Sequence, residues 1–149
     1  GAARGGGMTL AISCDLIVAG RGATFGYPEI DIGVIPAIHY AHLEPIVGRT
    51  RAFDLLFTAR SFDAQEAERI GLVNAIVDDD RLLAHARMLA QTLAAKPRHA
   101  LRAGRDAFRR EVNDGYRQRV ARAVENFCAV ASGEEAKRKI AAFLSRTKS

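Results

Sequence analysis

Three successive glycines are the first residues of this chain whose type and spacing could support chemistry. Gly5, Gly6 and Gly7 stand directly before a stretch with the composition of a short helix. Glycine lets a backbone approach a ligand closely, and the first turn of a helix offers unpaired N–H groups at the positive end of its dipole. Such a turn can hold a phosphate or an oxyanion. It can also serve close helix packing, and the residues alone leave both interpretations open.

Two phosphate-binding patterns do not fit these glycines. A Walker motif requires Gly-Lys-Ser/Thr after its glycines, whereas Gly7 is followed by Met8 and Thr9. The Rossmann fingerprint requires a preceding strand and a later acidic residue, and we predict neither here. The glycine turn therefore does not indicate a nucleotide site of these two kinds.

Glu29 is the candidate acid or base, since it follows Pro28 at the end of a predicted strand. A carboxylate in apolar surroundings has a raised pKa, which suits proton transfer near neutral pH. The residues alone favour a surface glutamate at a turn, and Asp31 is a rival carboxylate. His39 and His42 lie three residues apart, but no Glu or Cys stands at ligand spacing. We expect surface or structural histidines and no metal site.

Length and composition indicate one globular domain. The 149 residues are 48% hydrophobic, which is enough for a core. No run approaches the roughly 20 apolar residues that span a membrane, and no secretory leader is visible, so we expect a cytoplasmic protein. Cys14 and Cys128 lie outside any metal-ligand spacing and are expected to be buried free thiols. Gly1 lies in a glycine-rich stretch typical of mid-domain sequence, which predicts a fragment.

The net charge of +5 is concentrated at the carboxyl end. Residues 97–149 hold 13 Lys/Arg against 6 Asp/Glu, whereas residues 1–96 hold 9 against 11. A basic surface can attract nucleic acid, an anionic membrane or a phosphate-bearing ligand, but a solvated face is the favoured interpretation. Tyr116, Phe127 and Phe143 fall on apolar helical stripes and are expected in the core. We therefore expect neither nucleic acid nor membrane as a partner.

Short strands alternate with helices in the first half of the chain, and helices alone fill the second. Strands are predicted at 16–19, 23–26 and 72–77, and helices at 8–14, 38–47, 50–58 and 64–70, with four more helices after residue 79. Expected caps are Ser61 or Asp63, then Asp80, and a capping box of Ser132 with Glu135. Residues 1–7 are expected to form a flexible turn. This order predicts an α/β class with a helical appendage.

A set of residues also follows a characteristic order along nearly the whole chain. They are Gly1-x-Ala3-x-Gly5-Gly6-Gly7-x-x-Leu10-Ala11-x-x-Cys14-Asp15, Ala23-x-Phe25-x-x-Pro28-Glu29-x-x-x-Gly33-x-x-Pro36, Ala64-x-Glu66-Ala67-x-x-x-Gly71-Leu72-Val73 and Ala142-Phe143. This order resembles the enoyl-CoA hydratase/isomerase (crotonase) family. The resemblance implies a partial crotonase-like ββα spiral core over residues 1–78. It also implies a helical carboxyl-terminal trimerisation region over residues 79–149, in a homotrimer or hexamer.

The resemblance further implies an activity and the residues that carry it. Family members polarise the thioester carbonyl of an acyl-CoA with two backbone N–H groups, and Gly6 matches the second of these donors. Glu29 matches a catalytic glutamate. Substrate binding is expected at Gly5, Gly6, Thr9, Pro36 and His39, where bulky residues after Pro36 replace a turn that is often glycine-rich. No cofactor is implied, because coenzyme A is part of the substrate.

Thr9 stands where two-acid hydratases of the family carry a second catalytic glutamate. Threonine has no useful pKa and can only orient a water or a substrate hydroxyl. A single carboxylate can still move a proton between two carbons, as in double-bond isomerisation. We therefore predict an acyl-CoA lyase/isomerase with Glu29 as its one acid/base. A catalytically inactive truncated fragment that retains assembly or binding roles is the alternative, and a polyanion-binding basic tail is a third possibility.

Overall fold

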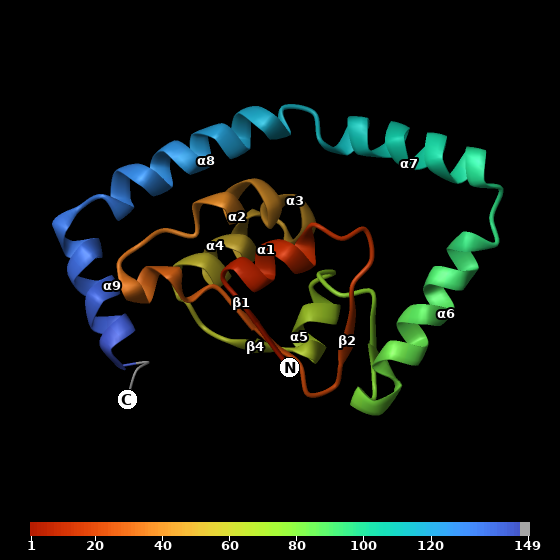
Figure 1. Cartoon of the computed structure of the whole chain (residues 1–149), viewed down its shortest axis with the longest axis horizontal. Coiled ribbons are helices and arrows are strands. Elements are labelled where there is room, and N and C mark those ends of the chain that lie inside the picture. The colour runs from red at the N-terminus through yellow and green to blue at the C-terminus, as the bar shows by residue number, and fades with distance from the viewer. Residues whose placement is uncertain (147–149) are drawn as a thin grey trace.

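The computed structural model describes residues 1–146, in an α/β part followed by a helical part (Figure 1). The first part contains β1 (Ala2–Arg4), α1 (Gly6–Ile12), β2 (Val18–Gly20), β3 (Thr24–Gly26), the 3₁₀ helix η1 (Pro28–Ile32), α2 (Ala37–His42), α3 (Glu44–Val47), α4 (Arg49–Phe57), β4 (Phe62–Asp63), α5 (Ala64–Arg69) and β5 (Ala75–Val77). The second contains the 3₁₀ helix η2 (Asp79–Arg81), α6 (Leu82–Ala94), α7 (Arg98–Val112), α8 (Tyr116–Ala131) and α9 (Glu134–Arg146). The predicted α/β class with a helical carboxyl-terminal region is confirmed.

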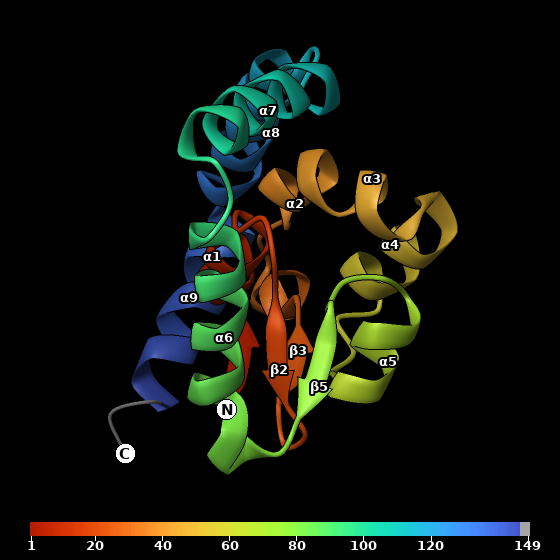
Figure 2. The same ribbon diagram turned by 90° about the vertical axis from the view of Figure 1, so that its right-hand side faces the viewer.

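Two small sheets organise the α/β part. β1 pairs parallel with β3, which pairs antiparallel with β4, and β2 pairs parallel with β5 (Figure 2). Phe25 on β3 lies between Ala3 on β1 and Phe62 on β4, and the two phenylalanine rings stack with centroids 5.5 Å apart. The expected flexible turn over residues 1–7 is therefore wrong for Ala2–Arg4. This strand is too short for an alternating pattern, so only its distant partner reveals it.

The core lies between these strands and the helices α1, α2, α4 and α5. Met8, Tyr27 and Leu43 are completely buried, and burying an apolar side chain of this size contributes about 1.5–3 kcal/mol. Successive residues of a helix point roughly 100° apart, so Thr9 faces away from the core direction that Met8 takes. The Thr9 hydroxyl accordingly faces α2, 3.4 Å from the Nε2 atom of His39. Core packing thus sets the face of α1 that meets the candidate site.

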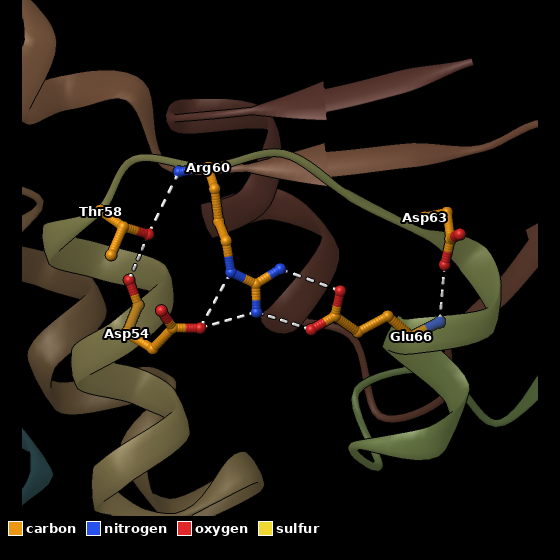
Figure 3. A network of polar contacts seen from close by, with 5 residues as sticks. All are labelled: Asp54, Thr58, Arg60, Asp63 and Glu66. Carbon is orange, nitrogen blue, oxygen red and sulfur yellow. Dashed lines mark hydrogen bonds and ion pairs between the residues drawn. The ribbon is translucent and has the colours of Figure 1, made fainter.

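A charged network joins α4 to α5 (Figure 3). Arg60 donates to Asp54 Oδ2 at 2.6 and 2.9 Å and to the two carboxylate oxygens of Glu66 at 2.6 and 2.9 Å. Hydrogen bonding to Arg60 lowers the pKa of Glu66. Asp63 begins α5 by accepting the Glu66 N–H at 2.7 Å, so the cap is Asp63, one of the two predicted.

We expect Arg60→Met to lower the free energy of unfolding at neutral pH by about 1 kcal/mol, the upper end for exposed ion pairs. The Arg60 side chain is 38% exposed, so water screens the network. Glu66 has its folded pKa below the usual 4.5, so its share of the stability is present above that value. It disappears as pH falls through the folded pKa. Urea unfolding at neutral and acid pH measures this, with Arg49→Met as control. An equal loss at both pH values would contradict the charge argument.

The four carboxyl-terminal helices form an arc around the α/β part (Figures 1 and 2). α6 packs on β2, α8 on α2, and α9 on η1. Arg105 and Arg109 of α7 form ion pairs with Asp15 at 2.7 and 3.2 Å. None of the described helices is long and apolar enough to cross a membrane.

Two expected caps of these helices are wrong. η2 leads directly into α6, and no side chain, Asp80 included, caps that helix. Ser132 ends α8 rather than beginning α9, because its hydroxyl donates back to the carbonyl of Ala129 at 3.1 Å. The hydroxyl therefore interacts with α8 and does not form the predicted capping box at the start of α9.

Several side chains that were expected in the interior lie at the surface. Cys14 and Cys128 are both exposed, and Phe127 and Phe143 are 41% and 49% exposed. Other exposed apolar side chains of the arc are Leu83, Met88, Leu93, Leu101, Phe108, Val112, Val124, Val130 and Leu144. Helical periodicity identified an apolar stripe correctly but could not tell whether this chain covers it.

Candidate active site

A cavity of about 260 Å³ lies between α1, the segment that joins η1 to α2, and α8. Its walls are Gly6, Thr9, Glu29, Ile35, Pro36, Ala37, Ile38, His39, Ala123, Val124 and Phe127. The structure therefore brings together five of the six residues that the sequence analysis selected, and the sixth, Gly5, directly precedes Gly6 of the cavity wall. The roles assigned to these residues stay predictions.

Gly5 gives the glycine turn its shape. Its φ of 48° and ψ of −115° belong to a region that residues with a Cβ rarely adopt. The Gly5 carbonyl accepts the N–H groups of Met8 at 2.9 Å and Thr9 at 3.1 Å, which starts α1 at Gly6. A Cβ on Gly5 would lie 3.5 Å from Glu29 Oε1. As the first residue of α1, Gly6 keeps an N–H that no carbonyl of the helix can accept.

Glu29 is held at the cavity by the short helix η1. Pro28 begins that helix, and Gly33 ends it with a φ of 79°. The Glu29 side chain is only 16% exposed, and its Oε1 lies 3.4 Å from His39 Nε2. Its Oε2 is buried and has no hydrogen-bond partner among residues 1–146. The alternative of a surface glutamate is thus wrong, whereas Asp31 is exposed and lies outside the cavity.

His39 is the buried histidine of the site, with 1% of its surface exposed. Its ring meets the Tyr27 ring edge-on, with centroids 4.5 Å apart. Burial, and secondarily the charge of Glu29, raise the pKa of Tyr27, so this hydroxyl stays protonated near neutral pH. His42 stacks on Tyr116 of α8 and hydrogen-bonds its hydroxyl. The described residues contain no His, Cys, Asp and Glu cluster that could hold a metal ion.

The partly buried position of His42 predicts a pH effect on stability. Burial is the largest cause that lowers the pKa of His42 below its usual 6.5. The unfolded chain therefore binds this proton at higher pH than the folded chain, and stability is lost as pH falls from 6.5 towards the folded pKa. His42→Phe keeps a ring against Tyr116 but cannot titrate. We expect it to reduce the acid-side slope of unfolding free energy by up to about 1.4 kcal/mol per pH unit.

Urea unfolding across this pH range measures the slope, and the exposed His99 of α7 provides a control in His99→Phe. Identical slopes for the wild type and His42→Phe would contradict the lowered pKa of His42.

The match to a known family decides how this cavity is interpreted. The model of the family described as enoyl-CoA hydratase/isomerase matches residues 1–149 of the chain. The chain belongs to the enoyl-CoA hydratase/isomerase (crotonase) family. This match covers both the α/β part and the helical arc.

Individual crotonase relatives agree with that assignment. A protein of Rhizobium meliloti named "Probable enoyl-CoA hydratase" is 38% identical over 149 residues, which are 99% of this chain and 58% of that protein. The 2,3-dehydroadipyl-CoA hydratase of Escherichia coli K12 is 34% identical over 147 residues, 98% of this chain and 58% of that protein. An enoyl-CoA hydratase/isomerase structure from Pseudoalteromonas atlantica superposes with a TM-score of 0.90 and 28% identity, over 98% of this chain and 59% of that one. The chain spans somewhat more than half the length of these relatives.

Sequence reasoning missed one wall of the crotonase cavity. Ala123, Val124 and Phe127 come from α8, far along the chain from the glycine turn. The apolar stripe of α8 was recognised, but its packing across α2 is a tertiary contact without a local signal. The helical region therefore contributes to the candidate site as well as covering the α/β part.

Proposed function

We propose that this chain forms part of an acyl-CoA lyase/isomerase of the enoyl-CoA hydratase/isomerase type. Gly6 N–H would be one oxyanion donor for the thioester carbonyl, and Glu29 the single acid/base. The observation that carries the proposal is that Gly6 and Glu29 line one cavity in a chain of this family. A second oxyanion donor would have to come from outside these 149 residues.

Double-bond isomerisation is the reaction that one carboxylate serves best. Glu29 removes a proton from C2 of a 3-enoyl-CoA, and the C–H electron pair forms a C1–C2 double bond while negative charge collects on the thioester oxygen. That oxygen is stabilised by the Gly6 N–H. Glu29 then returns the proton to C4, which leaves the double bond between C2 and C3. The same carboxylate takes up and releases one proton, so the sequence of steps balances.

Hydration is less well served by the residues around the cavity. Water must add at C3 of a 2-enoyl-CoA while a proton reaches C2, and two ionisable groups divide this work more readily than one. Thr9 lines the cavity and can orient a water, but it cannot exchange a proton near neutral pH. We therefore infer faster isomerisation than hydration.

Two spectrophotometric assays test this proposal on the complete gene product that contains this chain. Hydration of crotonyl-CoA removes the double bond that is conjugated with the thioester, whereas isomerisation of a 3-enoyl-CoA creates such a conjugated double bond. We expect the second reaction to be faster. Turnover of neither substrate would contradict the proposed function. Turnover by the 149-residue chain alone would refute the alternative of an inactive fragment that retains only assembly or binding roles.

The proposed assembly is a homotrimer or hexamer, formed through the helical arc. Its support is the family membership of the chain and the apolar side chains that α6 to α9 leave exposed, such as Met88, Phe108 and Phe143. Analytical ultracentrifugation of the complete gene product tests it. A monomer at micromolar concentration would contradict this assembly.

A further inference from the structure

We propose that His39 is a positioning residue of the Glu29 site: its Nε2–H holds Glu29 Oε1 and leaves Oε2 as the oxygen that carries the proton. This inference rests on the proposed function. It starts from a cluster of three polar side chains that α1, η1 and α2 bring to one cavity wall, namely Thr9, Glu29 and His39.

The distances single out one ring nitrogen of His39. Its Nε2 lies 3.4 Å from Glu29 Oε1 and 3.4 Å from Thr9 Oγ1, whereas its Nδ1 is buried and has no partner among the described residues. The Thr9 contact is a long hydrogen bond, whereas the Glu29 contact is an ion-pair distance beyond the roughly 2.7–3.2 Å that is usual for a hydrogen bond. Contacts between catalytic groups are often loose before a substrate tightens them. Nε2 is therefore the nitrogen that interacts with the site.

The surroundings of that ring also assign its hydrogen. A carboxylate only accepts hydrogen bonds, so a hydrogen on Nε2 satisfies Glu29. A hydrogen on Nδ1 would be a buried donor without an acceptor, which folded proteins avoid. We therefore place the ring hydrogen of His39 on Nε2.

The backbone and the core keep this donor in place. His39 lies in the first turn of α2, where its N–H donates to the Pro36 carbonyl at 3.0 Å and its own carbonyl accepts from Leu43 at 2.9 Å. The ring is 1% exposed and contacts Tyr27 edge-on. A side chain packed in this way has no room to change rotamer, so Nε2 keeps a fixed position beside Glu29.

The two oxygens of Glu29 therefore have different roles: Oε1 holds the side chain in position, and Oε2 carries the proton. Oε1 lies against His39 and close to Gly5, where even a methyl group on the glycine would come within 3.5 Å. Oε2 has no partner among residues 1–146. A carboxylate anchored by one oxygen presents the other in a constant orientation, which is what proton transfer between two carbons of one substrate requires.

Two substitutions of His39 separate positioning from packing. His39→Gln places an amide N–H near the position of Nε2–H, whereas His39→Leu fills the space without a donor. We expect His39→Leu to lower kcat by about 10- to 100-fold, the range for groups that orient a functional side chain, with a smaller change in KM. His39→Gln should recover most of this rate. Equal losses in the two variants, or full activity of His39→Leu, would overturn the proposal.

Nitrogen-15 NMR of the imidazole signals provides a readout that does not need turnover. We expect a neutral His39 with its hydrogen on Nε2, and an Nε2 signal that moves in Glu29→Gln while that of the exposed His99 does not. A hydrogen on Nδ1 would overturn the proposal even in an active enzyme. If the wild type turns over no enoyl-CoA, the proposed function fails, but the NMR result still decides whether His39 holds Glu29.

Discussion

Glu29→Gln in the complete gene product is expected to lower kcat by at least ~100-fold, the lower end for general acid–base catalysis, with little change in KM. Glutamine has the size of glutamate and keeps an oxygen at the position of Oε1, 3.4 Å from His39 Nε2. It cannot take up a proton near neutral pH at the position of Oε2, the buried oxygen without a partner. The substitution therefore removes proton transfer while leaving the shape of the cavity intact.

Steady-state kinetics with a 3-enoyl-CoA measures this effect, and Asp31→Asn is the matched control. Asp31 lies two residues further along η1, but its side chain is exposed and outside the cavity. The control should retain the wild-type rate, since it removes a carboxylate without touching the site. An unchanged kcat in Glu29→Gln would exclude Glu29 from the mechanism, and a comparable loss in Asp31→Asn would point to the charge of η1 instead.

The helices were the most predictable part of the fold, because a period of 3.6 residues is visible within a single segment. The same pattern could not say what covers an apolar stripe, so Phe127 and Phe143 were misplaced in the core although they are 41% and 49% exposed. β1 was missed for a related reason. A three-residue strand is recognised only through its partner β3, which follows after the intervening α1 and β2.

The candidate site was predictable only in part. Residues alone favoured a surface role for Glu29, and the family resemblance, rather than any local pattern, placed it opposite Gly6. The contact between Thr9, Glu29 and His39 depends on how α1, η1 and α2 pack around Met8 and Tyr27, so the order of residues does not predict it. Local rules predict elements well, whereas a site formed by three elements is a property of their packing.

Gly5→Ala is expected to lower the free energy of unfolding by about 1–3 kcal/mol, the usual cost of a residue forced into a sparsely populated backbone region. Gly5 has a φ of 48° but a ψ of −115°, so it lies outside even the left-handed helical region that other residues visit. For a chain of this size the loss corresponds to a fall in Tm of roughly 2–12 °C. Thermal and urea unfolding followed by circular dichroism measure it.

Gly7→Ala is the control with the opposite expected sign. Gly7 lies inside α1, and a Cβ there would meet nothing closer than Ala3 Cβ at 4.0 Å. Alanine within a helix is favoured over glycine by about 0.5–1 kcal/mol, and Gly7 is the second residue of α1, so this variant should be more stable than the wild type by at most that amount. If Gly5→Ala were equally stable, the turn would not need its observed backbone angles. The backbone angles of Gly5 would then not explain why the Gly6 N–H and the Glu29 carboxylate line the same cavity.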